Sequence, residues 1–537
     1  MAKKTLRAMA VLALLAFLNG NAFAANNATS TTTGTGNTSN ISQSGDGQNA
    51  TVDQNGNDND SNVDQSNLGN TADVSQDGDN HVSTVNQSGE NNEAEVIQDD
   101  TNQASSVDQS GDGNYTQVDQ SGDNNDSTVD QSGNDNDAYV AQNGTTNNSN
   151  VDQSGNENYA DVAQTGDNQA SSVDQSGNGN NAYVNQADAD NESNVDQSGN
   201  DNLADVAQTA TNNDSDVDQS GNENEAYVTQ VNDLNHSQVD QSGDDNLATV
   251  DQDRGNQSTV DQSGNGNTAD VNQIGNVVGT NVGNESTILQ SGDLNTATVN
   301  QDDDNVSTVD QQGDLNLATV DQTGFSGTDA NESNVLQLGD GNIADVTQNG
   351  NLNLSNITQR FGNDAFVRQS GTDNESNVDQ GDSNSADVEQ SGDRNLSNVN
   401  QHHATFESDS NEAYVLQTGN DNVSNINQDG SIPNGLSLDN VASVEQSGDW
   451  NVANVTQDDF NEANVLQTGL GTSANPNVVN INQWNDSDLA NAEQHGGEGN
   501  LINIDQEACC SSGGGTFNSA TAIQTGSFNT TTIVQLP

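Results

Sequence analysis

The segment SNVDQSGNDNLADVAQTATNND, from Ser193 to Asp214, contains the pattern that decides the fold. It consists of two similar halves of 11 residues, and the same three residue types recur at alternate positions in each half. These residues are Ser193, Val195 and Gln197 in the first half and Ala204, Val206 and Gln208 in the second. Side chains at alternate positions share one face of an extended strand, and a central β-branched valine favours strand over helix. Each half therefore predicts a β-strand with one small, apolar and amide-bearing face.

A turn signal follows each of these glutamines, typically Ser-Gly-x-x-Asn, as in Ser154–Asn158. Glycine adopts positive φ angles freely, and Asn and Asp tolerate them while bonding to their own backbone. We therefore expect each half to be a strand followed by a tight turn, with the glycine at positive φ.

The 22-residue unit recurs along most of the chain. Glutamines follow one another every 11 residues from Gln43 to Gln252, and Ser and Ala alternate four positions before them from Ser39 to Ala442, with Thr116 as the one substitution. A single unit cannot bury its apolar face, whereas stacked units can. The sequence predicts an all-β, two-sheet parallel β-solenoid of the cross-β type. It would have about 20 rungs of 22 residues, each made of two 11-residue strand-turn halves and spaced ~4.8 Å apart.

Stacking places like residues on like. Valines would form apolar columns, and the buried Gln and Asn side chains would form amide ladders, each bonding to its copy above and below. Such ladders avoid the cost of burying unpaired amides. We predict that the core ladder includes Gln131, Gln142, Gln153, Gln164, Gln175, Gln186, Gln197, Gln208, Gln219, Gln230, Gln241, Gln252, Val129, Val140, Val151, Val162, Asn158, Asn180, Asn202 and Asn224.

The stretch from Gln197 to Gln208, QSGNDNLADVAQ, resembles the curlin repeat, Q-x-G-x-G-N-x-A-x3-Q preceded by a serine. The chain differs in placing Asp, Asn or Glu at the second glycine, in having more repeats and in being more acidic. The resemblance implies a secreted subunit that is unfolded on export and polymerises into curli amyloid fibres of the biofilm matrix. It also implies a curli-type nucleator and an outer-membrane secretion pore as partners.

The chain divides into four segments. Residues 1–24 read as a signal peptide, with Lys3, Lys4 and Arg7 before a short apolar run and an A-x-A site at its end. The alternative is a retained anchor, but the run is too short to be a transmembrane segment, and no later run is long enough. Residues 25–38 are predicted to be flexible, either as a linker or, by the resemblance, as a secretion-targeting segment. Residues 39–446 form the regular repeat solenoid, and residues 447–537 are degenerate repeats that lose the Ser/Ala phase and form a C-terminal cap or docking end.

Six insertions interrupt the later repeats, between 273 and 290, 322 and 337, 401 and 417, 428 and 446, 467 and 483, and 506 and 524. Each must lie in a turn, because an insertion inside a strand would exchange its two faces. The last strand, Thr531–Gln535, ends near the terminus and is expected to leave an open edge that can pair with another chain.

Acidic residues dominate the charge. The formal net charge is −75, and removal of residues 1–24, which hold three basic and no acidic residues, would leave −78. Nucleic acid is therefore not expected as a partner. Low apolar content with this charge is also typical of disorder, which remains the alternative for the isolated monomer.

One acidic stripe is regular. In the Ser-bearing halves, the residue before the glutamine is Asp on eight successive rungs, and these outward carboxylates would stack in a column. We treat them as a candidate cation-bridging stripe for Ca²⁺ or other cations, with no other cofactor expected: Asp108, Asp130, Asp152, Asp174, Asp196, Asp218, Asp240 and Asp261.

We find no catalytic motif. His402-His403 has no zinc-site context, and Cys509-Cys510 would form either an interchain bridge or a vicinal disulfide. Tyr139, Tyr183 and Tyr227 recur every 44 residues, as an outward contact surface or as a trace of duplication. The sequence thus predicts an extracellular, cell-surface-associated structural fibre subunit for biofilm and cell adhesion. The alternative is a soluble, monomeric acidic β-solenoid adhesin or cation-binding stalk.

Overall fold

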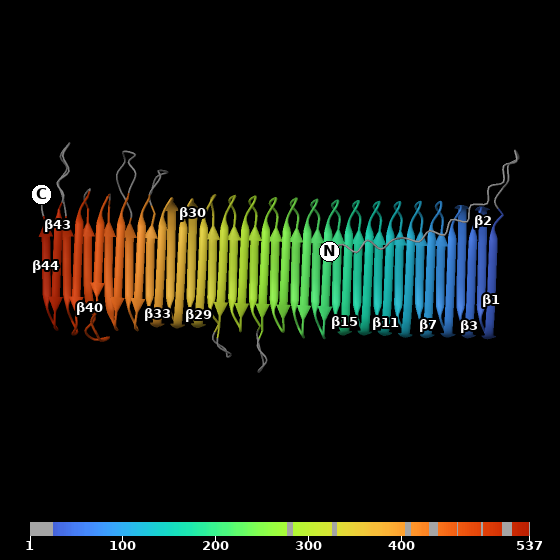
Figure 1. Ribbon diagram of the computed structural model, residues 1–537, viewed down its shortest axis with the longest axis horizontal. Coiled ribbons are helices and arrows are strands. Elements are labelled where there is room, and N and C mark those ends of the chain that lie inside the picture. Colours follow the sequence, from blue (N-terminus) through green and yellow to red (C-terminus); the bar gives the residue numbers. More distant parts are fainter. Residues whose placement is uncertain are drawn as a thin grey trace, which may run out of the picture.

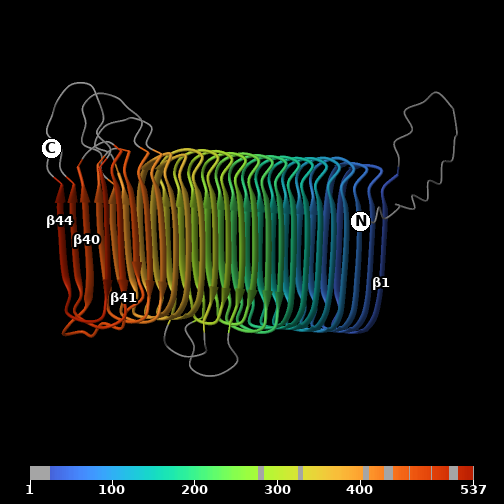
Figure 2. The ribbon, with the colours of Figure 1, turned by 60° about the vertical axis from the view of Figure 1, so that its left-hand side comes forward.

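The chain forms one long, two-layered rod of β-strands that lie across its axis (Figures 1 and 2). The computed structural model describes residues 25–275, 283–324, 330–402, 410–428, 439–458, 460–484, 487–506 and 518–535. These ranges contain 44 strands in two sheets of 22, and no helix, so no described helix could cross a membrane. The predicted two-sheet parallel solenoid is confirmed, with 22 rungs where about 20 were expected.

Successive strands alternate between the two sheets. We call the sheet of odd-numbered strands the Ala sheet and the sheet of even-numbered strands the Ser sheet, after the small residue that each half-repeat carries. The Ala sheet contains β1 (Asn27–Thr35), β3 (Asn49–Asn57), β5 (Thr71–Asp79), β7 (Glu93–Thr101), β9 (Tyr115–Asp123), β11 (Asp137–Thr145), β13 (Tyr159–Asp167), β15 (Asn181–Ala189), β17 (Leu203–Thr209), β19 (Glu225–Val231), β21 (Leu247–Asp253), β23 (Thr268–Ile274), β25 (Thr296–Asp302), β27 (Leu317–Thr323), β29 (Ile343–Asn351), β31 (Asp364–Thr372), β33 (Ser385–Asp393), β35 (Glu412–Thr418), β37 (Val441–Ser447), β39 (Glu462–Gln467), β41 (Leu489–His495) and β43 (Ser519–Thr525). The Ser sheet contains β2 (Thr38–Asp46), β4 (Asp60–Leu68), β6 (Val82–Gln87), β8 (Ala104–Gln109), β10 (Asp126–Gln131), β12 (Asn148–Gln153), β14 (Ala170–Gln175), β16 (Glu192–Gln197), β18 (Asp214–Gln219), β20 (His236–Gln241), β22 (Gln257–Gln262), β24 (Glu285–Gln290), β26 (Val306–Gln311), β28 (Glu332–Gln337), β30 (Leu354–Phe361), β32 (Glu375–Asp382), β34 (Leu396–Gln401), β36 (Val423–Gln428), β38 (Asn451–Gln457), β40 (Asn477–Gln483), β42 (Leu501–Gln506) and β44 (Thr530–Gln535).

Strands within a sheet pair in parallel and in register. In the Ser sheet, β12 pairs with β14 so that Val151 lies beside Val173 and Gln153 beside Gln175. In the Ala sheet, β11 pairs with β13 in the same manner. Because the shift between partners is one whole repeat, each residue type forms a column along the rod, as the 22-residue period predicts.

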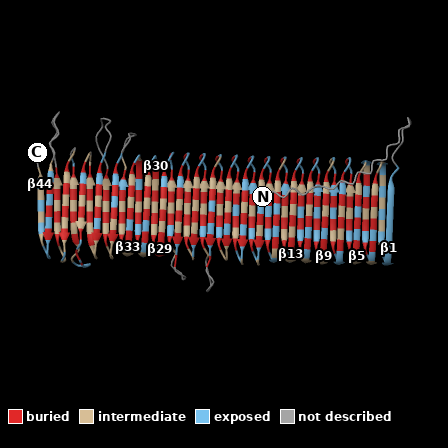
Figure 3. Ribbon diagram, in the orientation of Figure 1, coloured by how far each residue is buried: buried red, intermediate tan, exposed pale blue. Residues whose placement is uncertain are grey.

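The core lies between the two sheets and consists of these columns. From β3 to β43 the small residue, the apolar residue and the glutamine are buried and the residues between them are not, as in β12 and β13, which gives the continuous rows of buried positions in Figure 3. Valine, alanine and a few isoleucines supply all of the large apolar core cluster. The core is therefore thin, narrow and uniform, which suits a structure in which every rung meets nearly the same neighbours.

The turns after the Ser-sheet strands correct our expectation about glycine. Gly155 lies outside the left-handed region, and the positive φ angle is two residues later, at Glu157 (55°). Gly155 is needed for another reason: a Cβ atom there would lie 1.5 Å from the carbonyl oxygen of Gly177 on the next rung. After the Ala-sheet strand β13 the expectation is right, since Gly166 has a φ of 124°. Stacking distance, as well as backbone conformation, thus selects glycine.

The two ends also differ from expectation. We expected residues 25–38 to be flexible, whereas β1 spans Asn27–Thr35 and pairs with β3 over its whole length. After Gln446 the alternation of sheets continues. Ala463 and Ala490 stay in the Ala sheet, while larger apolar residues replace serine in the Ser sheet. All six insertions lie between strands, as predicted, so the register survives them.

Candidate assembly site

The predicted glutamines form two continuous amide ladders, one in each sheet. Gln153 Nε2 donates to Gln175 Oε1 at 2.8 Å, and Gln175 Nε2 donates to Gln197 Oε1 at 2.8 Å. The second N–H of Gln175 donates to the backbone carbonyl of Tyr159, 3.0 Å away in the facing sheet. All twelve predicted glutamines from Gln131 to Gln252 are at most 2% exposed. Every ladder bond runs in one direction, from Nε2 of one rung to Oε1 of the next, so the ladder has a donor end and an acceptor end.

The predicted valines form the apolar part of the same core. Val129 lies beside Val151 in the Ser sheet, and Val140 lies beside Val162 in the Ala sheet. All four are at most 2% exposed. The inward faces are therefore assigned as the sequence indicated.

The asparagine column is bonded differently from the glutamine ladders. The backbone N–H of Asn180 donates to Asn158 Oδ1 at 2.9 Å, and Asn180 Nδ2 donates to the carbonyl of Gly199 at 2.8 Å. Asn202 and Asn224 repeat this arrangement, and all four asparagines are at most 1% exposed. Each asparagine thus bonds to the preceding rung through its backbone N–H and to the following rung through its side-chain amide, whose partners there are backbone groups.

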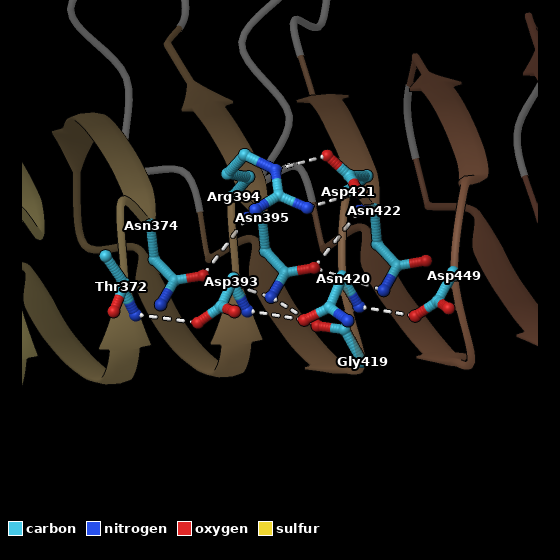
Figure 4. Close-up of polar contacts among 10 residues, drawn as sticks. All are labelled: Thr372, Asn374, Asp393, Arg394, Asn395, Gly419, Asn420, Asp421, Asn422 and Asp449. Atoms are coloured by element: carbon cyan, nitrogen blue, oxygen red, sulfur yellow. Dashed lines mark hydrogen bonds and ion pairs between the residues drawn. The ribbon is translucent and has the colours of Figure 1, made fainter. Parts of the chain in front are cut away.

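A second ladder, on the outside of the turns that follow the Ala-sheet strands, was not foreseen. In Figure 4, the backbone N–H of Thr372 donates to Asp393 Oδ1, that of Asp393 to Asn420 Oδ1, and that of Asn420 to Asp449 Oδ1, at 2.9–3.1 Å. It runs opposite to the inner asparagine column, in which Asn395 N donates back to Asn374. The recurrence of Asn or Asp directly after the turn glycine, as in Gly392-Asp393, Gly419-Asn420 and Gly448-Asp449, was the available sequence signal.

The structure places all eight aspartates of the predicted stripe in one column. They occupy adjacent positions on successive Ser-sheet strands, from β8 to β22, and are half-buried or exposed. Partial burial, and then the neighbouring carboxylates, raise the pKa of Asp130, Asp196 and Asp240. Among the described residues no three His, Cys, Asp or Glu side chains are placed to hold a metal ion together. Cation bridging therefore stays a prediction that rests on the column alone.

The rod ends in strands with one unpaired edge. Within the described residues, β1 and β2 pair only with β3 and β4, and β43 and β44 pair only with β41 and β42. Ile41 in β2 and Ile533 in β44 are only partly buried, although they continue the core column. The N-terminal end presents Gln43 Oε1, and the C-terminal end presents the amide of Gln535, which accepts from Gln506 at 2.7 Å. We call these ends the acceptor pole and the donor pole.

The tyrosines form a larger cluster than the sequence indicated. Tyr139 and Tyr183 project from the outer face of the Ala sheet, beside Asp161. Tyr115 and Tyr159 join them from the neighbouring column, giving a run of four rings with centroids 5.4–5.5 Å apart. Burial within this run raises the pKa of Tyr115 to about 12. The 44-residue spacing of Tyr139 and Tyr183 did not reveal the cluster, because its four tyrosines alternate between two columns.

Two of the other sequence features fall partly or wholly outside the described residues. Cys509-Cys510 and His403 lie there, whereas His402 is half-buried just after β34.

Arg394, one of four basic residues after residue 24, binds Asp421 on the next rung through two hydrogen bonds of 2.8 Å (Figure 4).

Comparison with known families identifies the repeats. The curlin associated repeat model matches ten segments, residues 34–66, 69–99, 105–133, 122–155, 133–166, 155–187, 189–221, 199–231, 210–243 and 243–275. The comparison with curated proteins found no match. Residues 34–275 therefore consist of curlin associated repeats, a structural repeat, and the solenoid beyond them continues the same architecture.

Proposed function

We propose that this curlin-repeat chain is the structural subunit of extracellular, curli-like amyloid fibres that grow by stacking one rod on the end of another. The fibres would support a biofilm matrix and cell adhesion. The observation that carries the proposal is an unbroken, in-register parallel ladder that ends in an unpaired strand edge at each pole. Exposed edges of this kind are templates for pairing with another chain.

End-to-end stacking would continue the valine and glutamine columns of the Ser sheet. The donor pole of one copy would meet the acceptor pole of the next, so that Gln535 of one copy donates to Gln43 of the other, as each Ser-sheet glutamine does to its neighbour. Ile533 and Ile41 would then become buried like the interior residues of their column. In the Ser sheet the junction would thus resemble any other rung step, which is the condition for unlimited growth.

Export and assembly partners complete the proposal. Residues 1–24 have the layout of a secretory signal, and a curli-type secretion pore and nucleator are the partners that the repeat family suggests. The rival function, a soluble acidic adhesin or cation-binding stalk, has one supporting observation, since a single chain already builds a rod of 22 rungs.

The test is seeded growth of the purified chain without residues 1–24. Wild-type protein should give fibres with a meridional reflection near 4.8 Å and should elongate from preformed seeds. Ile533→Asp should slow elongation at least tenfold, because the carboxylate would be buried between two rungs at each junction. A matched control, Val534→Asp, puts the same charge on the outward face of β44, where the side chain is 53% exposed, and should elongate nearly as fast as wild type. A rod that stays monomeric at high concentration and moderate salt would instead establish the stalk.

A further inference from the structure

The outer face of the Ser sheet near the donor pole is almost free of charge. We call it the neutral face and define it as the outward side chains of β34, β36, β38, β40, β42 and β44. Among these side chains only Asp505 is charged. Earlier in the same sheet, every even-numbered strand from β8 to β22 presents an aspartate of the acidic column. In a chain with a formal net charge of −75, a neutral face of six strands is an exception.

Two columns give this face its chemistry. The first is apolar and half-buried, and consists of Leu396, Val423, Val452, Val478 and Leu501. The second consists of Asn398, Asn425, Asn454, Asn480 and Asn503, in which each Nδ2 donates to the next Oδ1 at 2.8 Å. This outward amide ladder was not foreseen from the sequence, and it lies beyond residue 275, where the matched curlin repeats end.

The asparagine ladder lowers the free-energy cost of removing water from the neutral face. Each asparagine already uses one N–H and one oxygen lone pair along the fibre axis. Covering such an amide leaves fewer groups unsatisfied than covering an isolated asparagine would. Covering the adjacent apolar column is favourable by itself. Stacked asparagines beside apolar residues on a flat sheet are the components from which dry sheet-to-sheet contacts are built.

We propose that the neutral face is a lateral docking surface for the same face of a second copy, by which neighbouring fibres associate side by side. The proposal rests on the fibre function proposed above. Two facing sheets pack about 10 Å apart, and because both copies have the same rung spacing, their asparagine columns can match along the whole contact.

The charge distribution of the chain favours the neutral face of a second copy as the partner of this neutral face. Another copy of the chain is strongly acidic, so close approach is least unfavourable where neither partner carries charge. The opposite face, on the Ala sheet, offers no alternative, because four consecutive strands there each present a glutamate: Glu412, Glu445, Glu462 and Glu493. Face-to-face contact through the Ala sheet would bring these carboxylates together.

The area of the neutral face determines whether single chains or only fibres can associate through it. Six strands of about six residues present roughly 29 Å by 20 Å, or about 600 Å², whereas a stable interface buries about 800 Å² on each partner. Single chains should therefore associate only weakly through this face. In a fibre the face recurs about every 105 Å, so many weak contacts act together and the fibres bundle.

The test adds two charges to the neutral face and, as a control, the same two charges to the opposite face. The first variant is Asn454→Asp with Asn480→Asp, a hydrogen-bonded pair on adjacent Ser-sheet strands. The control is Asn464→Asp with Asn491→Asp, an equivalent bonded pair on adjacent Ala-sheet strands. Elongation from seeds is measured separately from fibre width by electron microscopy at ~0.15 M salt.

We expect both variants to elongate within about twofold of wild type. Wild type and the control should form bundles, and the neutral-face variant should form single fibres, with mean width reduced at least twofold. Bundles of wild-type width from the neutral-face variant, or equal dispersal of both variants, would overturn the docking surface and leave the fibre function intact. Failure of wild type to form any fibre would overturn the proposed function and this inference with it.

Discussion

At the scale of single residues, the fold depends on burying an amide in every half-repeat. Glutamine is uncommon in protein cores because an unpaired buried amide costs about 1–3 kcal/mol. Here each one donates to a copy of itself and to a backbone carbonyl, as Gln175 does to Gln197 and Tyr159. The residue is tolerated only because its neighbours on both rungs are identical, which makes the repeat a condition of the core.

Breaking three successive steps of one ladder tests this dependence. Replacing Gln175, Gln197 and Gln219 with Leu would remove the ladder acceptor of Gln153 and the ladder donor of Gln241, and would leave three backbone carbonyls without their side-chain donors. We expect the free energy of unfolding to fall by about 3–6 kcal/mol and the fibre lag time to lengthen, measured by denaturant titration and seeded growth. Exposed Ser176 provides the control, since Ser176→Ala should change stability by less than about 0.5 kcal/mol. Equal losses from both changes would show that the inward face is assigned wrongly.

At the scale of elements, the first strand is an incomplete rung. β1 pairs with β3 over nine residues but is exposed throughout, and it carries Ser30 and Thr32 in the valine and glutamine slots. As a result the Ala-sheet ladder begins one rung late, and Gln54 Oε1 is buried without a hydrogen-bond partner. The acceptor pole is therefore the weaker end of the Ala sheet.

Completing that ladder should stabilise the acceptor pole. In Thr32→Gln, the new Nε2 can donate to Gln54 Oε1, as Gln54 donates to Gln76 at 2.9 Å. One satisfied hydrogen bond is worth about 1 kcal/mol, so hydrogen exchange of the β1 amides should slow about fivefold. Thr33→Gln, which places the same side chain on the outward side, should leave exchange unchanged. Equal protection from the two changes would mean that β1 does not pair in the register described here.

At the scale of the whole molecule, the rod folds against its own charge. The acidic column brings carboxylates one rung apart, where two unit charges repel by about 0.9 kcal/mol even in water, or about 0.5 kcal/mol at 0.1 M salt. In the unfolded chain neighbouring members are 21 or 22 residues apart in sequence and interact little. Folding thus raises the pKa of column members such as Asp174 and Asp218, mainly through burial. The acidic column therefore destabilises the folded state, and solvent conditions that neutralise or screen the carboxylates reduce this destabilisation.

Acid should therefore favour assembly. A carboxyl whose pKa is raised on folding disfavours the folded state above that raised pKa, and this penalty disappears below the ordinary value of 3.8. Asp174→Asn, Asp196→Asn and Asp218→Asn together remove four neighbouring repulsions, about 2 kcal/mol at 0.1 M salt. The triple variant should shorten the lag at pH 7 and depend less on pH between 7 and 4 than wild type does.

A control and a second condition separate the column from bulk charge. Asp112→Asn, Asp244→Asn and Asp293→Asn remove the same charge from exposed turns, where the oxygens accept backbone N–H groups and Asn retains the acceptor. This control should keep most of the wild-type pH dependence. Millimolar calcium should shorten the wild-type lag more than that of the column variant, if cations bridge adjacent carboxylates. If the wild-type lag time is the same in chelator, in calcium and in acid, the acidic column does not control assembly and is only a solvent-exposed face.

The sequence by itself determined the architecture, because a strict period leaves few choices. Alternation of Ser or Ala with Val and Gln fixes the inward face, and the 22-residue spacing fixes which residues stack, so the ladder of Gln175 and the stacking of Asn180 in a column could be predicted. Only the tertiary structure decided what depends on distances between rungs and on adjacent columns. It showed that Gly155 is required by the approach of Gly177, that asparagine bonds to backbone groups, and that the outer face is neutral near β44. Each of these properties depends on the distance and orientation between residues on different rungs. The spacing of residues in the sequence predicts which residues are neighbours, but it does not give the distances and orientations between them.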